Sequence, residues 1–375
     1  MNNSKGAFAD QREPLFDLDP TKPTQAIEPL GLVSGRSALD LCESGGGFAL
    51  AGGPIAFTHG RIGDDILTAG EMRNWAIKSS TSGDASPARR IEALTSPRAD
   101  FAELALSGAG SGPRIMGVCN VTLDSFSDGG DHDAPDAAIA FAHELITAGA
   151  DMIDVGGEST RPGADPISHE AELARVLPVV EALAGAGVCV SIDTRHATVM
   201  REAIAVGATI VNDVMALTGP GALEAVAQSH ASIVLMHMQG MPQTMQDFPA
   251  YQDVTADVFA WLTTRVWACV EAGISMDRIA IDPGFGFGKT IDHNVRLLAQ
   301  LGVFHGLGCA VAVGLSRKSF IGALTGEDDP ASRVAGSVAA ALVAVGQGAQ
   351  IVRVHDVAET RAAFTIWQAQ TGVIG

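Results

Sequence analysis

From Arg114 onward, short apolar runs alternate with longer amphipathic segments. The apolar runs are rich in β-branched and small residues, which is typical of strands. Eight such runs occur, at residues 114–120, 151–157, 188–194, 209–214, 232–238, 278–284, 310–316 and 350–356. The Ala-rich segments between them predict helices, for example at 135–150, 169–187 and 357–370. Pro178, inside the second of these, should kink or split its helix.

The number and order of these segments indicate the fold. Strands that are apolar on both faces belong to a parallel sheet that helices cover. Eight strand–helix units in roughly 250 residues are what a closed (β/α)8 barrel requires. An open doubly wound sheet is the alternative, but it usually has fewer units and a Gly-rich first turn. We therefore predict an α/β fold, with a (β/α)8 TIM barrel over residues 111–375.

Residues 1–110 lack this alternation. A strand near 48–58 and a short helix near 86–95 stand out, and composition predicts a partly disordered tail of roughly 25 residues before them. The run LSGAGSGP at 106–113 is typical of a linker. The domain prediction is therefore an irregular N-terminal extension or small accessory domain at 1–110, followed by the barrel at 111–375.

Composition and charge exclude several classes of protein. The chain has 375 residues and a formal net charge of −19, which argues against binding to nucleic acid or to an anionic membrane. A few local cations could still hold an anionic small molecule. We expect no membrane span and no signal peptide, because no apolar run is long enough and the N-terminus is polar. The five cysteines form no C-x-x-C pair, so we expect no disulfides, no zinc and a cytoplasmic location.

Polar side chains gather at the ends of the predicted strands, where the chemistry of a TIM barrel lies. These residues are Asn120, Glu158, Ser159, Thr160, Arg161, Asp193, Asn212, Asp213, His237, Gln239, Asp282, Ser316, Arg317, Lys318, Ser319, Arg353 and His355. Any one of them could be a turn or helix-capping group. Polar ends on all eight strands at once indicate a binding site.

One group within this set suits a polar heterocycle. Asp193, Asn212 and Asp282 place two carboxylates and an amide in one pocket, where they could pair with adjacent N–H donors. A divalent cation is the alternative, although barrel metal sites usually contain more His or Glu. The nearby run PGFGFGKT at 283–290 is not a phosphate-binding loop of the Walker type, because proline stands where that motif needs its first glycine.

A second group suits phosphate or pyrophosphate. Asn120, Arg353 and His355 follow the first and last strands, which are neighbours once the barrel closes. A basic pair beside an amide is well matched to phosphate oxygens. Lys318 and Arg317, after the seventh strand, add positive charge between the two groups. The spacing therefore predicts a heterocycle site joined to a phosphate site.

These residues lie in motifs that resemble those of the bacterial dihydropteroate synthases. The matching blocks are IMGVCNVTLDSFSDGG (115–130), DVGGESTRPGA (154–164), SIDT (191–194), VNDV (211–214), LMHMQGMPQTMQ (235–246), DPGFGFGK (282–289), GLSRKSFIG (314–322) and VRVHDV (352–357). They run in order through residues 114–375, and residues 1–110 lie outside the common enzyme core. The family condenses 6-hydroxymethyl-7,8-dihydropterin pyrophosphate with p-aminobenzoate in folate biosynthesis. It uses Mg²⁺ and is the sulfonamide target.

The resemblance also implies roles for individual residues. The pterin would be held by Asp193, Asn212, Asp282 and Lys318, with Met238 against its ring. Pyrophosphate would be bound by Asn120, Arg353 and His355, with Asn120 reaching the Mg²⁺. The p-aminobenzoate side would be formed by Phe126, Thr160, Arg161, Pro162, Phe287 and Ser319. The residues expected to act in catalysis are Asp128, Arg161, Lys318, Arg353 and His355, with Asp128 near the Mg²⁺ or its water.

One departure and two alternatives accompany this interpretation. Leu123 stands where the family loop usually has proline, which puts the efficiency of loop closure in doubt. The pterin-dependent methyltransferases share the Asp/Asn/Asp set, but the STRPG and SRKS motifs argue against them. A pterin-binding paralogue without catalysis is the other alternative. The resemblance also favours a homodimer that binds only small-molecule substrates.

Overall fold

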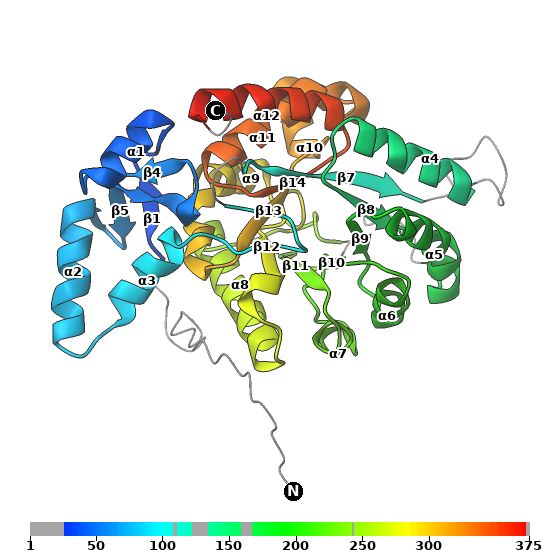
Figure 1. The fold of residues 1–375 in the computed structure, drawn as a ribbon, viewed down its shortest axis with the longest axis horizontal. Coiled ribbons are helices and arrows are strands. Elements are labelled where there is room, and N and C mark those ends of the chain that lie inside the picture. The colour runs from blue at the N-terminus through cyan, green and yellow to red at the C-terminus, as the bar shows by residue number, and fades with distance from the viewer. Residues whose placement is uncertain (1–25, 108–110, 122–133, 159–166, 242–243, 373–375) are drawn as a thin grey trace, which may run out of the picture.

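The computed structural model describes residues 26–107, 111–121, 134–158, 167–241 and 244–372. Eight parallel strands form a closed barrel, in which each strand pairs with the next and the last pairs with the first (Figure 1). They are β7 (Arg114–Asn120), β8 (Met152–Gly156), β9 (Val190–Asp193), β10 (Ile210–Asp213), β11 (Ser232–Met236), β12 (Ile279–Asp282), β13 (Ala310–Gly314) and β14 (Ile351–Val354). The predicted (β/α)8 barrel is confirmed, and each strand falls within a predicted apolar run.

Helices surround the barrel on its outside (Figure 1). They are α4 (Ala134–Thr147), α5 (His169–Gly185), α6 (Ala197–Ala205), α7 (Ala222–Ala227), α8 (Val254–Glu271), α9 (Ile291–Ala299), α10 (Ser319–Thr325), α11 (Val334–Gly346) and α12 (Val357–Thr371). Short 3₁₀ turns complete this ring: η2 (Met276–Arg278), η3 (Leu301–Leu307) and η4 (Pro330–Arg333). Pro178 lies inside α5 without splitting it. None of the described helices is long and apolar enough to cross a membrane.

Side chains alternate between the two faces of each barrel strand. On β8, Ile153 and Val155 pack outward in the main core against the helices, whereas Met152 packs inside the barrel. The same period of two places Asp154 on the inner face, directly above Met152. The inner layer at the opposite, amino end of the strands is apolar and contains Met116, Met152, Ile210, Val234, Ala280, Ala310, Ala312 and Ile351. The interior of the barrel is therefore apolar at the amino ends of the strands, called the lower end below, and polar at their carboxyl ends, the upper end.

Residues before β7 close the lower end of the barrel. Phe101 and Leu106 are buried in the same cluster as the inner apolar layer. Phe101 also forms an isolated antiparallel bridge with Leu104. The run at 106–113 was predicted to be a linker, but its first residue, Leu106, belongs to the barrel core. The reason is that an apolar side chain gains more from filling the open end of the barrel than from solvent.

Residues 27–95 form a folded module beside the barrel (Figure 1). One antiparallel sheet has the order β1-β5-β6 and the other has the order β2-β4-β3. The elements are β1 (Glu28–Leu30), β2 (Val33–Ser34), α1 (Arg36–Glu43), β3 (Phe48–Ala49), η1 (Leu50–Gly52), β4 (Ile55–Phe57), β5 (His59–Ile62), β6 (Asp65–Thr68), α2 (Ala69–Thr81) and α3 (Ser86–Thr95). The predicted helix at 86–95 is present. The tail predicted for the first 25 residues lies outside the described residues.

The strand predicted near 48–58 is interrupted in the structure. It is divided into β3 and β4 by η1, where the backbone turns through Ala51 and Gly52 with φ of 50° and 65°. Pro54 follows before β4 begins. The apolar composition of this segment serves a small separate core, which includes Leu50, Ile55 and Phe57. Burial in that core, and not strand continuity, explains the apolar pattern.

Arg98 fastens the module to the barrel. The guanidinium is buried and donates to the carbonyls of Ala93 and Ser96 on one side, and to those of His305 and Cys309 on the other. Burial lowers its pKa to about 10, so the group stays charged at neutral pH. At the far end of the chain, Trp367 of α12 packs against the core of the module. The module is therefore held at two separate places.

Candidate active site

The polar upper layer of the barrel begins with Arg353 of β14. Its Nε donates to Asp154 Oδ2 at 2.6 Å, and its Nη2 donates to Asp193 Oδ2 at 2.9 Å. Asn212 Nδ2 also donates to Asp154 Oδ2, at 3.1 Å. These four residues come from β14, β8, β9 and β10, so the barrel brings them together across its interior. The remaining N–H groups of Arg353 make no hydrogen bond within the described part of the chain, which leaves them for a ligand.

Two buried carboxylates face this interior with capacity to accept more hydrogen bonds. Asp193 is bonded through Oδ2 to Arg353, and Asp282 through Oδ1 to the Gly284 amide at 2.7 Å. Among the described residues, no donor reaches the second oxygen of either group. Burial, reinforced by the Asp154 charge, raises the pKa of Asp193 despite Arg353. Burial also raises the pKa of Asp282. A ligand that offers N–H donors would stabilise the charged form of both carboxylates.

Lys318 and Phe287 form the side of the site next to Asp282. The Lys318 ammonium lies 4.0 Å from the centre of the Phe287 ring, in a cation–π contact. Its stem crosses Gly286, where a Cβ would lie 3.1 Å from Lys318 Cδ and φ is +78°. Glycine at 286 therefore leaves room for the lysine. Burial and the nearby Arg353 charge lower the pKa of Lys318 to about 8.

The apolar part of the site is formed by methionines and Phe287. Met238 is buried in a small cluster with Val214, Met236 and Met245, and Phe287 packs against this cluster. Ser319 begins α10, immediately after Lys318. A flat ring bound here would therefore meet thioethers and the Phe287–Lys318 pair as well as the buried carboxylates.

Asn120 is the last residue of β7, and His355 follows β14, as the sequence predicts. A Cβ on Gly156 would lie 3.4 Å from Asn120 Oδ1 and 3.5 Å from Asp193 Cβ, so these two side chains flank the same glycine. His355 Nδ1 is 3.0 Å from Ser316 Oγ, and that hydroxyl also accepts from the His355 amide. If the Ser316 hydroxyl donates to Nδ1, the neutral ring carries its hydrogen on Nε2. Burial, with Arg353 nearby, lowers the pKa of His355 to about 3, so the ring is neutral at neutral pH.

Two residues of the site were not predicted from the sequence. Asp154 is fully buried and orients both Arg353 and Asn212. The available signal was a charged residue inside the apolar run DMIDVGG, because a buried carboxylate requires partners. Lys289 is also buried; its Nζ donates to the carbonyls of Gly284 at 2.9 Å and Phe287 at 3.0 Å. Lys289 therefore shapes the loop that carries Phe287. The run at 283–290, which is not a Walker motif, does not predict this role.

Phe126, Asp128, Thr160, Arg161 and Pro162 lie outside the described residues, as does Leu123.

Arg317 departs from its prediction, which placed its charge between the two ligand groups. Its guanidinium instead forms an ion pair with Asp356, and its amide donates to Ser337 Oγ at 2.9 Å. The residue has φ of 60°, and this left-handed turn sends adjacent side chains in different directions. Lys318 therefore provides the charge between the groups without Arg317.

Comparison with known proteins agrees with this geometry. The family described as pterin binding enzyme matches residues 116–355. The dihydropteroate synthase of Escherichia coli (strain K12) is 50% identical over 260 residues, which cover 69% of this chain and 92% of that protein. The dihydropteroate synthase of Neisseria meningitidis serogroup C is 51% identical over 261 residues, with 68% and 92% covered.

The chain belongs to the dihydropteroate synthase family. A solved structure of this family, the Xanthomonas albilineans enzyme with 4-aminobenzoic acid, has a TM-score of 0.68 and 52% identity, and covers 73% of this chain and 98% of its own. The same organism's enzyme with 7,8-dihydropteroate has a TM-score of 0.64 and 49% identity, covering 70% and 95%. The family predicted from the motifs is confirmed. The matched region starts within β7, so the N-terminal module lies outside the family match.

Proposed function

We propose that this chain is a dihydropteroate synthase in activity as well as in family. It would condense 6-hydroxymethyl-7,8-dihydropterin pyrophosphate with p-aminobenzoate to give 7,8-dihydropteroate and pyrophosphate. The observation that carries the proposal is the pair of buried carboxylates, Asp193 and Asp282, each with an oxygen that no described donor reaches. A pterin presents adjacent ring and amino N–H groups to such a pair. Related structures with 4-aminobenzoic acid and with 7,8-dihydropteroate support the same substrates.

The pterin would lie across the upper layer of the barrel. Asp193 and Asp282 would accept hydrogen bonds from its donor edge, and the Asn212 amide is held by Asp154 to complete that edge. Met238 would pack against the ring. Each bond to an ionised group contributes about 1.5–3 kcal/mol when both partners are buried. This set fixes the orientation of the ring, and with it the direction in which the exocyclic methylene points.

The leaving pyrophosphate would lie toward Asn120, Arg353 and His355. Arg353 keeps N–H groups for it, and His355 offers Nε2–H from a neutral ring. Mg²⁺ fits here, because it is commonly held by one or two protein oxygens together with substrate phosphates and water, and the Asn120 amide supplies such an oxygen. When bound, Mg²⁺ would neutralise charge on the pyrophosphate. The donors from the protein stabilise that same charge as the C–O bond breaks.

The new bond would form between the p-aminobenzoate nitrogen and the pterin methylene. The C–O bond to pyrophosphate breaks, the C–N bond forms, and the nitrogen then loses a proton to solvent or pyrophosphate. An arylamine is nucleophilic while neutral, so no strong base is required. Phe287 and Lys318 would place the arylamine, together with Ser319 and the predicted residues at 126 and 160–162. Positioning and stabilisation of the leaving group would therefore supply most of the catalysis.

Two further proposals accompany this function. We propose a cytoplasmic location, which is supported by the five cysteines, all of them free thiols. We also propose a homodimer, on the family resemblance alone.

One assay tests the proposed activity. The full chain is incubated with the two purified substrates and Mg²⁺, and both dihydropteroate and pyrophosphate are measured. Equal amounts of the two products are expected, and Lys318→Met should reduce their rate of formation. Tight pterin binding without any product would indicate the paralogue that lacks catalysis. Methyl transfer to or from a folate in place of condensation would indicate the methyltransferase alternative.

A further inference from the structure

The segments that follow β11 and β12 lie against each other at the upper end of the barrel. A Cβ on Gly284 would overlap the carbonyl oxygen of His237, and a Cβ on Gly288 would overlap that of Gln239. Both glycines also have positive φ, of 73° and 62°. The two backbones therefore touch at two places, and glycine is the residue that fits at each contact.

Lys289 joins these two segments through its ammonium group. Nζ lies 3.0 Å from Nδ1 of His237, which follows β11. It also donates to the carbonyls of Gly284 at 2.9 Å and Phe287 at 3.0 Å, which follow β12. An ammonium has three N–H donors and no acceptor, and these three neighbours can all accept. The contacts therefore use the full donor capacity of Lys289, and they leave the hydrogen of a neutral His237 ring on Nε2.

The His237 ring is held in turn by aromatic neighbours. Trp261 of α8 meets it edge-on, with ring centroids 5.0 Å apart, and the centroid of the Tyr251 ring lies 6.1 Å away. The Tyr251 hydroxyl donates to the Gly288 carbonyl at 2.8 Å. Burial lowers the pKa of His237 to about 3, and the Lys289 charge adds to this shift. The ring is therefore neutral at neutral pH and keeps Nδ1 as an acceptor.

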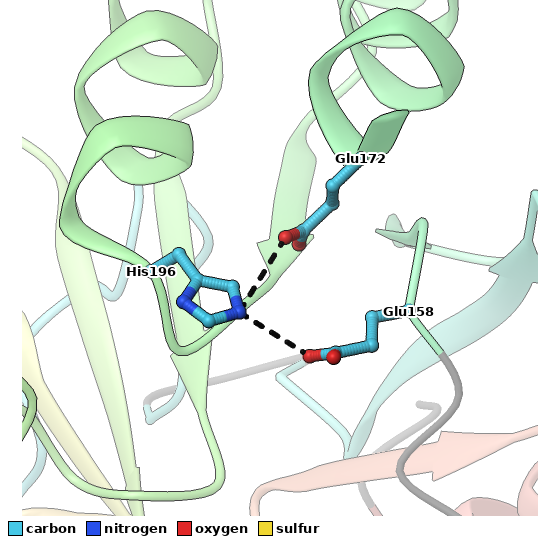
Figure 2. Close-up of side chains that lie close together, drawn as sticks. All are labelled: Glu158, Glu172 and His196. Carbon is cyan, nitrogen blue, oxygen red and sulfur yellow. Dashed lines mark ion pairs between the residues drawn. The ribbon is translucent and has the colours of Figure 1, made fainter. Parts of the chain in front are cut away.

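A second cluster of charged side chains, where β8, β9 and α5 meet, holds its cation differently. Figure 2 shows His196 between Glu158 and Glu172, with Nε2 3.5 Å and 3.9 Å from their Oε2 atoms. Arg195 donates to both oxygens of Glu158, at 3.0 and 2.9 Å. A divalent cation on Glu158 would be repelled by this guanidinium, at a depth where water screens little. Lys289, in contrast, has no carboxylate among its hydrogen-bond partners in the described part of the chain.

The position of Lys289 is costly for a cation. Burial lowers its pKa to about 7, although the charge of Asp282 opposes this shift. The three acceptors around Nζ offset part of that cost, but only while the two segments keep their spacing. His237 is followed directly by Met238, and Phe287 provides one of the carbonyls. Loss of these contacts would therefore displace both Met238 and Phe287.

We propose that His237 and Lys289 are positioning residues for the ring-binding part of the site. Through Met238 and Phe287 they set the shape of the apolar surface that receives the heterocycle, and neither needs to touch it. The inference rests on the proposed function, because it takes that heterocycle to be a pterin.

Two substitutions of nearly equal size separate the hydrogen bond from packing. His237→Asn places an amide oxygen near the position of Nδ1, whereas His237→Leu offers Lys289 no acceptor. Calorimetry of the full chain with a pterin that lacks phosphates should show about tenfold weaker binding for His237→Leu, which corresponds to about 1.4 kcal/mol. His237→Asn should stay within about threefold of the wild type. The affinity for pyrophosphate with Mg²⁺, proposed to bind toward Asn120, Arg353 and His355, should change in neither variant.

Lys289→Met removes the ammonium itself and should weaken binding of the same pterin by more than about tenfold. Its matched control is Lys78→Met, which changes an exposed lysine on α2. The control for His237→Leu is His230→Leu, at an exposed position before β11. Both controls should leave the affinities for pterin and for pyrophosphate unchanged.

Several outcomes would overturn the inference. A purely structural role predicts that His237→Leu lowers both affinities equally or lowers neither. Equal pterin affinities for His237→Asn and His237→Leu would show that the bond to Lys289 does not position the site. If Lys289→Met fails to fold, the two His237 variants still decide the question. A wild type that binds the pterin but forms no dihydropteroate removes the proposed function alone, and the same affinities then test this inference. A wild type that binds no pterin overturns both.

Discussion

Arg353 and Asp154 form an ion pair across the interior of the barrel, with Nε 2.6 Å from Oδ2. Asp154 is fully buried, and it also accepts from Asn212. One carboxylate therefore orients a guanidinium predicted to bind pyrophosphate and an amide predicted to bind pterin. The two halves of the site are joined through a residue that belongs to neither half.

Asp154→Asn should damage both halves at once. The amide cannot balance the charge of Arg353, and loss of one partner of a buried ion pair costs on the order of 3 kcal/mol of stability. Urea unfolding measures that loss, and calorimetry with a pterin and with pyrophosphate should show both affinities reduced. Asp151→Asn is the control, because Asp151 pairs with Arg114 and Arg361 at the opposite end of β8. A variant that loses pyrophosphate affinity alone would contradict the shared role.

Asp282→Asn should weaken pterin binding by about 2–3 kcal/mol, because one accepting oxygen is replaced by a donor. Titration with a pterin that lacks phosphates gives the affinity directly. Asp277→Asn, at the exposed turn before β12, should have no effect. Pterin affinity within twofold of the wild type would show that Asp282 does not bind the ring.

Glu172 should make the folded protein less stable as the pH rises. Burial raises its pKa from an ordinary value near 4.5 to about 7. The folded state therefore holds this proton more tightly than the unfolded state does. That contribution to stability is complete below about pH 4.5 and is lost as the pH rises through 7.

The measurement is the free energy of unfolding at several pH values between 4.5 and 7. Glu172→Gln should decline less steeply than the wild type over this interval. Glu181→Gln, on the exposed face of the same helix, should keep the wild-type slope. Parallel curves for wild type and Glu172→Gln would mean that the proton on Glu172 is not linked to folding.

Arg98→Met should destabilise the protein by about 3 kcal/mol or more, because it leaves several buried carbonyls without a donor. Thermal unfolding measures this. The reaction takes place at the other end of the barrel, so kcat and both KM values of the folded protein should stay close to those of the wild type. The exposed Arg89→Met on α3 provides the comparison. A selective loss of kcat with normal stability would contradict a purely architectural role.

The barrel could be predicted because the same pattern of an apolar run and a helical segment recurs along the sequence. Each strand is an apolar run that ends in a polar residue or has one within the next two positions, as in β12, where Ile281 is followed by Asp282. The N-terminal strands gave no such signal, since β2 and β3 have only two residues each. Alternation cannot be recognised over so short a span. Composition alone could not distinguish a folded module from an irregular extension.

Side-chain pairing was the other part that the sequence did not predict. Position at a strand end placed Arg353 in the site, but its partners depend on which strands face it across the barrel. Asp154 was missed for the same reason: its role arises from contacts with β10 and β14, far away in the chain. Arg317 shows the converse, because one left-handed residue sent its side chain to Asp356. The types of residues and their order along the chain therefore predict which side chains line a site better than they predict which of those side chains pair with one another.

The position of Phe101 has a consequence for any attempt to shorten this protein. The family match starts at residue 116, yet the aromatic ring that fills the lower opening of the barrel comes before it. A fragment trimmed to the shared enzyme core would expose the side chains of Met116, Met152 and Ile210 to water, and apolar openings of this kind promote aggregation. A fragment that retains the catalytic part should therefore begin before Phe101. A variant that began after Phe101 would need a replacement side chain at the same opening.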